Sequence, residues 1–201
     1  MDFKSAVIAV VITVTGVQAA GVPPASAVHS PHLSTVENRA TNQITLQELL
    51  DRVSVVVHNS FPKAELLVAS GESPSGPTRD MSHVTDWRFI YSTGADLGIK
   101  TVEVRATLSG QISRPINYKA SWRGALPFRG SISLTPTDAY NILQEMGHRE
   151  AYKYVALVTP LVGEQRRQYH FNRQIEGGCD GYAVGIDDHI AGPICDGGPL
   201  F

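Results

Sequence analysis

Two segments of the sequence match each other at a constant separation of 82 residues, and this repetition limits the fold more than any other feature. Self-similarity at a fixed separation indicates a repeated structural unit. The matching pairs are Trp87 and Tyr169, Phe89 and Phe171, Val102 and Val184, Val104 and Ile186, Leu108 and Ile190, Gly110 and Gly192, and Ile112 and Ile194. The sequence therefore predicts two copies of one unit, with the same elements in each.

The first copy is predicted to begin with a helix. Thr45 and Glu48 have the spacing of a capping box, in which each side chain accepts a hydrogen bond from the backbone N–H of the other residue. The apolar residues that follow share one helical face, at Leu46, Leu49, Leu50, Val53, Val56 and Val57. Pro62 disfavours helical geometry at Phe61, so the helix is expected to end before this pair.

Three strands are expected after this helix. Residues 64–70 form a short apolar run, and residues 87–91 alternate between aromatic and other side chains. Residues 101–108 alternate between apolar and polar side chains, which is typical of a strand with one buried face. The intervening residues 71–85 are rich in glycine, serine and proline and are predicted to form a loop.

The second copy has the same order of elements. Thr135 is predicted to cap a helix with Pro136 at its first position, where the missing N–H costs nothing. The apolar stripe of this helix comprises Ala139, Ile142, Leu143 and Met146, and Gly147 is a natural stop. Strands are expected at residues 154–159, 169–171 and 182–186.

These elements predict an α+β fold made of two copies of a helix followed by a three-stranded antiparallel sheet, at residues 44–112 and 135–201. Each sheet has one apolar face, which its helix must cover. Residues 113–134 join the copies and are expected to pack between them, because they are too apolar for a free linker. Their large apolar side chains include Tyr118, Trp122, Leu126 and Phe128.

The N-terminal residues indicate a secreted protein. Residues 1–20 combine Lys4, an apolar run and small residues, which is typical of a cleaved signal peptide. Cleavage is expected after Ala19 or Ala20, or later, within residues 25–27. The apolar run is too short to span a bilayer core of about 30 Å, so no stable membrane anchor is expected. Residues 21–43 have no hydrophobic period and are interpreted as a flexible leader.

The two cysteines of the chain, Cys179 and Cys195, are predicted to form a disulfide, because free thiols are unusual in secreted proteins. A disulfide holds the two Cα atoms about 5.5 Å apart, so the chain must reverse between them. The adjacent Asp187, Asp188 and His189 suit such a turn. A single long strand through this region is the alternative, and the hairpin is favoured.

Six side chains of the second copy are candidates for a ligand pocket beneath its helix: Tyr154, Tyr169, His170, Tyr182, Asp188 and His189. Aromatic residues on strands are more often core residues than ligand contacts. Adjacent acidic residues are also more often turn formers than a metal or acid–base site. Arg166 and Arg167 are interpreted as a solvated charge pair in a loop rather than as a processing site.

No motif in the sequence assigns a reaction. Neither a nucleophile elbow nor a complete nucleotide-binding fingerprint is present, so we assign no catalytic, cofactor-binding or metal-binding residues. The formal net charge of −2 offers no electrostatic basis for binding nucleic acid. The sequence does not indicate an oligomeric state.

Three segments of the first copy resemble the PepSY family. They are residues 61–67 (FPKAELL), residues 87–91 (WRFIY) and residues 101–112, which run from an alternating strand to a turn containing glycine. The second copy matches more loosely, since Asp188 stands where the first copy has the small residue Ala106. The resemblance implies a cystatin-like helix-plus-sheet module with a propeptide, inhibitory or extracellular binding role, and it supplies no catalytic residues.

We therefore expect a secreted, noncatalytic binding or inhibitory protein whose partner is an extracellular protein or peptide. The partner surface is expected at the loop of residues 71–85 or at an exposed sheet edge. A small secreted cyclase, isomerase or hydrolase with a pocket between helix and curved sheet is one alternative. A host-directed secreted effector is the other.

Overall fold

Both helices begin where their capping residues predicted. The computed structural model describes residues 43–94, 98–163, 165–172 and 181–194, all within one compact unit, Ala40–Phe201. Helix α1 spans Leu46–His58 and has the complete capping box: Thr45 Oγ1 accepts from the Glu48 N–H at 3.1 Å, and Glu48 Oε2 accepts from the Thr45 N–H at 2.8 Å. Helix α2 spans Pro136–Glu145 and follows the N-cap Thr135.

The other elements among the described residues are nine strands and a short 3-10 helix, η1, at Met81–His83 in the predicted loop. The strands are β1 (Glu65–Glu72), β2 (Asp86–Ser92), β3 (Thr101–Thr107), β4 (Ile116–Tyr118), β5 (Ala125–Leu126), β6 (Tyr154–Pro160), β7 (Gln168–Asn172), β8 (Gly181–Gly185) and β9 (Ala191–Ile194). The six strands predicted from hydrophobic patterns are present. Of the other three, β4 and β5 lie in the segment predicted to join two copies, and β9 is the second arm of the favoured hairpin.

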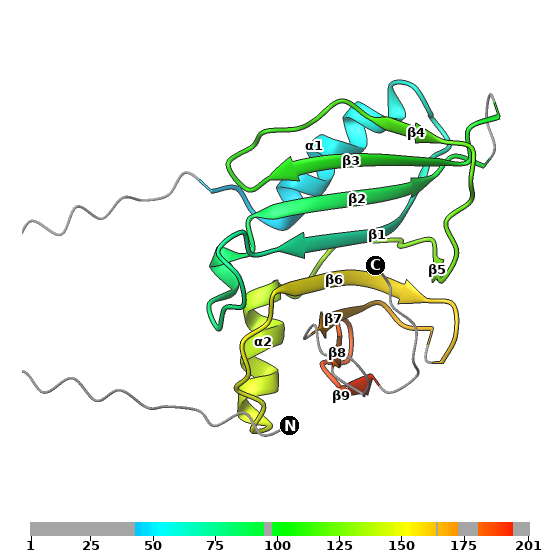
Figure 1. Ribbon diagram of the computed structural model, residues 1–201. Helices are drawn as coiled ribbons and strands as arrows, with labels where there is room; N and C mark the ends of the chain where they lie inside the picture. Colours follow the sequence, from blue (N-terminus) through cyan, green and yellow to red (C-terminus); the bar gives the residue numbers. More distant parts are fainter. Residues whose placement is uncertain (1–42, 95–97, 164, 173–180, 195–201) are drawn as a thin grey trace, which may run out of the picture. The chain divides into compact units, whose positions relative to one another are not determined.

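All nine strands belong to one antiparallel sheet, in the order β4-β3-β2-β1-β6-β7-β8-β9, with β5 paired separately to β6 (Figure 1). At its centre, β1 and β6 pair directly, with Val68 opposite Val158 and Glu72 opposite Tyr154. Two helices accompany the sheet, so helices and strands are combined as in an α+β fold. The predicted arrangement, two copies of a helix with a separate three-stranded sheet, is wrong.

The composition of β1 and β6 explains why the sheet is continuous. Residues 66–69 and 155–159 are buried without interruption, as expected for strands covered on both faces. In two separate sheets each of these strands would be an edge strand, with a row of unpaired N–H and C=O groups. Pairing β1 with β6 satisfies both edges at once.

One hydrophobic core lies between the helices and the face of the sheet that we call inner. Leu49 and Val53 of α1 and Leu143 of α2 belong to the same cluster as the inward side chains of the strands, which include Phe89 and Phe171. On the opposite, outer face, a smaller cluster contains Leu67, Val68, Ile90 and Val158. Trp122 and Ala125, which precede or begin β5, pack against this outer cluster.

The capping box of α1 allows a first test. Thr45→Ala removes the side-chain acceptor of the Glu48 N–H and is expected to lower the free energy of unfolding by about 1 kcal/mol. Thr45→Ser keeps the hydroxyl and is the matched control. Urea unfolding followed by circular dichroism measures both. Equal stability of the alanine and serine variants would show that the cap contributes nothing.

Candidate partner-binding surface

One stretch of the chain is strongly basic. Between residues 98 and 137 there are six cationic side chains and one carboxylate, Glu103, a net charge of +5 in a chain whose formal net charge is −2. The cations are Lys100, Arg105, Arg114, Lys119, Arg123 and Arg129. The net charge of the whole chain does not reveal this segment, because the rest of the chain is acidic and offsets its positive charge.

The basic stretch includes the edge of the sheet. Strand β4 lies at one end of the strand order and pairs with β3, with Tyr118 opposite Thr101 and Ile116 opposite Glu103 (Figure 1). Ile116 and Tyr118 are 44% and 41% exposed. No strand in the described part of the chain pairs with the other side of β4. This edge therefore presents free backbone groups beside exposed apolar side chains.

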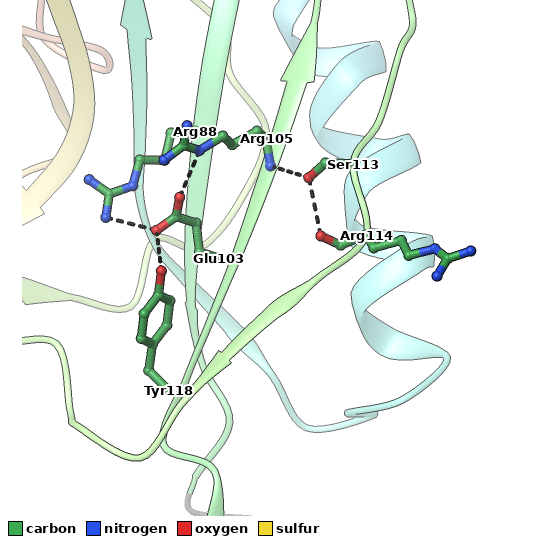
Figure 2. A network of polar contacts seen from close by, with 6 residues as sticks. All are labelled: Arg88, Glu103, Arg105, Ser113, Arg114 and Tyr118. Carbon is green, nitrogen blue, oxygen red and sulfur yellow. Dashed lines mark hydrogen bonds and ion pairs between the residues drawn. The ribbon is translucent and has the colours of Figure 1, made fainter.

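Behind this edge, on the outer face, a buried carboxylate holds two arginines. Figure 2 shows Glu103 of β3 between Arg88 of β2 and Arg105, with the hydroxyl of Tyr118 below it. Arg88 Nη2 donates to Glu103 Oε2 at 2.9 Å, and Arg105 Nε donates to Oε1 at 3.0 Å. The Tyr118 hydroxyl donates to Oε2 at 3.2 Å. Glu103 is 1% exposed, so these three donors replace the water that a carboxylate otherwise needs.

The electrostatics of this cluster keep Glu103 ionised. Burial alone raises the pKa of its carboxyl, but the hydrogen bonds from Arg105 and Arg88 and the charge of Arg88 outweigh burial, and the pKa lies below its ordinary value. Arg105 is 70% exposed, and in the described contacts its side chain uses only Nε. Its terminal amino groups thus face solvent with their direction fixed by Glu103.

The segment after β4 is fixed against the sheet. Thr101 Oγ1 donates to the Ala120 carbonyl at 2.8 Å and accepts from the Trp122 backbone N–H at 3.1 Å. The Arg88 guanidinium lies 5.6 Å from the Trp122 ring centroid. These contacts hold the exposed Lys119 close to β4. We call Lys100, Arg105, Arg114, Lys119 and Arg123, together with β4, the basic edge.

The six candidate pocket residues are divided between the two faces of the sheet and the turn after β8. Tyr169 is in the inner core, where its hydroxyl donates to the Leu134 carbonyl at 2.9 Å and burial raises its pKa. His170 is the adjacent residue and lies on the outer face, with Nε2 2.8 Å from Gln168 Nε2. Burial lowers the pKa of His170 to about 4. Tyr182 stacks on His148, with ring centroids 3.8 Å apart.

The other three candidates lie elsewhere. Tyr154 is contacted by the Lys153 ammonium, 4.8 Å from the ring centroid. Asp188 pairs with Arg166 at 2.6 Å, and the exposed His189 has a positive φ of 59° in the turn after β8. Strand neighbours point to opposite faces, so sequence proximity did not bring the six together.

The charged residues near this turn are paired rather than solvated. Arg166 binds Asp188, and Arg167 binds Asp187 through two nitrogens. Arg167 Nη1 also donates to the carbonyls of Arg129 and Ser131, both at 2.9 Å. The interpretation of Arg166 and Arg167 as a solvated pair is therefore wrong, and that of the two aspartates as turn residues is confirmed.

The predicted chain reversal is confirmed, because β8 and β9 form an antiparallel hairpin with Gly181 opposite Ile194. In sequence, Gly181 is two positions after Cys179, and Ile194 is one position before Cys195. Cys179 and Cys195 themselves lie outside the described residues, as do residues 1–42, which include the predicted signal peptide and almost all of the leader. The disulfide and the signal stay predictions.

Within residues 43–94, 98–163, 165–172 and 181–194, no group of three or more histidine, cysteine, aspartate or glutamate side chains is placed to hold a metal ion. No helix in these ranges has both the length and the apolar character needed to cross a lipid bilayer.

Comparison with known proteins gave no match to any family model, curated protein or solved structure. The resemblance to PepSY modules is therefore still a prediction.

Proposed function

We propose that this chain is a secreted, noncatalytic binding protein whose partner is an acidic, extended segment of an extracellular protein or peptide. The observation that carries the proposal is the free edge of β4 within a segment of net charge +5. The secreted location rests on the signal-like residues 1–20.

The proposed mode of binding is addition of the partner as a further strand. An extended peptide beside β4 would satisfy the free backbone groups of the edge, and the exposed Ile116 and Tyr118 would contact its alternate side chains. Acidic side chains on the partner would meet Lys119 and Arg114, which flank β4 in sequence. Complementary charge increases the association rate and rejects basic partners.

The basic character of the edge also discourages association of identical edges, since two copies would place like charges together. Lysine and arginine on an edge strand are a common protection against aggregation. This protective role predicts no affinity for acidic peptides, so a binding measurement distinguishes the two roles.

Fluorescence anisotropy with two labelled peptides tests the proposal. One peptide alternates glutamate with valine, and the other alternates lysine with valine. We expect the acidic peptide alone to bind, with an affinity that falls between about 0.02 M and about 0.15 M salt because screening increases. The double variant Arg114→Glu/Lys119→Glu is expected to bind it about tenfold more weakly.

Two controls make the outcome specific. Arg149→Glu reverses an exposed charge elsewhere and is expected to leave the affinity nearly unchanged. An acidic peptide with every backbone nitrogen methylated cannot donate to a strand edge and is expected to bind much more weakly. Equal binding of the methylated and unmodified peptides would refute strand addition, and equal effects of the two charge changes would refute the basic edge as the site.

A further inference from the structure

A cavity of about 280 Å³ lies on the helix side of the sheet, away from Glu103. Its lining comes from α1, from the start of β1, from β2 and from the segment after β5. The lining residues are Gln47, Leu50, Asp51, Ser54, His58, Ala64, Glu65, Leu66, Tyr91, Phe128, Arg129 and Gly130. Because the polar residues of α1 recur at positions 47, 51, 54 and 58, one side of the helix forms one wall.

The buried members of the lining are mainly apolar. Leu50, Leu66 and Phe128 are each at most 7% exposed and belong to the main core. Tyr91 is also buried, and its hydroxyl is 3.0 Å from Ser54 Oγ. Burial raises the pKa of Tyr91 to about 12, so this hydroxyl stays neutral at physiological pH. The side of the cavity formed by these residues therefore carries no charge and can contact an uncharged group.

The outer members of the lining are hydrogen-bond acceptors. Gln47 donates through Nε2 to Asp51 Oδ1 at 2.7 Å and accepts from the Ile132 N–H at 2.8 Å, so both ends of its amide are engaged. The hydrogen bond from Gln47 positions Asp51 through its Oδ1 atom. No contact among the described residues engages the Oδ2 atom of Asp51. His58 Nε2 donates to the Ala64 carbonyl at 2.9 Å, because a carbonyl only accepts.

The charges at the opening favour a cation. Asp51 and Glu65 carry two negative charges, and Arg129 supplies one positive charge, already paired with Glu65 at 2.7 Å. The net charge of these three groups is therefore −1. They are not clustered as ligands of a single metal ion, since no such group occurs among the described residues.

We propose that this cavity binds an alkylammonium group, an aliphatic stem that ends in one primary ammonium. The stem packs against Leu50, Leu66 and Phe128, and the ammonium donates to the free oxygen of Asp51. A small free amine and the side chain of a lysine in a peptide share this chemistry. This site is independent of the basic edge, because the basic edge selects an acidic partner and the cavity selects a cation.

Amide chemical shifts of the ¹⁵N-labelled chain test this site with three probes. They are n-pentylammonium, Nα-acetyl-lysine methylamide, and Nα-acetyl-norleucine methylamide, which has a similar stem without the amine. We expect saturable shifts at Asp51, Ser54 and Glu65 with one or both amines, and none with the norleucine probe. Shifts with pentylammonium alone identify a free amine as the ligand, and shifts with the lysine probe identify a peptide side chain.

Asp51→Asn keeps the shape of the side chain and removes its charge. It is expected to weaken amine binding about tenfold or more, because a hydrogen bond to a charged group is lost. Glu145→Gln, an exposed change on α2, alters the net charge equally and is expected to have no effect. The proposal is overturned if no probe shifts these amides, if norleucine binds as well as lysine, or if the two variants weaken binding equally. The spectrum of each unliganded variant verifies that it is folded.

Discussion

The variant Phe171→Ala is expected to unfold with a free energy about 3–5 kcal/mol below that of the unaltered chain. Phe171 is fully buried on β7. Its ring contacts three tyrosine rings, with centroid distances of 6.1 Å to Tyr140, 5.4 Å to Tyr152 and 6.4 Å to Tyr169. Truncation removes buried apolar surface and leaves a cavity that these rigid rings cannot collapse to fill.

Urea unfolding followed by tryptophan fluorescence and circular dichroism measures this effect. Val162→Ala also shortens a hydrophobic side chain, but Val162 is 78% exposed, so its effect is expected to stay within about 0.5 kcal/mol. A loss below about 1 kcal/mol for Phe171→Ala would mean that the side of the core formed by α2 and β7 is not closely packed.

The variant Glu103→Gln is expected to lower the free energy of unfolding by about 2 kcal/mol at neutral pH. Glutamine keeps the shape of the side chain but replaces a carboxylate by a neutral amide. The hydrogen bonds from Arg88 and Arg105 lose the negative charge of their acceptor, and one carboxylate oxygen becomes an amino group that cannot accept. The loss exceeds that of an exposed ion pair because Glu103 is buried.

The pH dependence of this difference follows from the lowered pKa of Glu103. A carboxyl whose pKa is lower in the folded than in the unfolded state stabilises the fold fully above its unfolded pKa, about 4.3. This contribution is lost as the pH falls through the folded-state pKa. The difference between the unaltered chain and Glu103→Gln is therefore expected to be largest at neutral pH and to shrink in acid.

Unfolding at about pH 7 and at about pH 3 checks this dependence. Glu145→Gln, on the exposed side of α2, is the control and is expected to change stability little at either pH. A difference between Glu103→Gln and the unaltered chain that stays constant across this interval would contradict the assignment of Glu103 as an ionised, stabilising group.

Local chemistry allowed the elements to be predicted. The hydroxyls of Thr45 and Thr135 cap helices through contacts within a few residues, so these helix starts can be predicted without knowing the tertiary fold. The alternation of apolar and polar residues along β3 likewise indicates a strand with one buried face. The arrangement of the sheet depends on which strands accept two neighbours. The continuous apolar runs of β1 and β6 were the available signal, since an edge strand of a small sheet has little need to be apolar on both sides.

The two candidate sites differ in how visible they are in the sequence. The basic edge is largely contiguous and could have been found by counting charges in a window instead of over the whole chain. The cavity beside α1 combines Asp51, Tyr91 and Arg129, which are separated by 40 and 38 positions. No local pattern relates these residues, so only the tertiary fold reveals that they share a cavity.

The pairing of β1 with β6 also has a consequence for how the chain reaches its native state. Val68 and Val158 are direct neighbours although 90 positions separate them, so their contact requires closure of a long loop at a considerable entropic cost. The hairpins of β2 with β3 and of β7 with β8 close much shorter loops. Local hairpins are thus expected to form early, and joining of the two halves at this central seam to limit the folding rate.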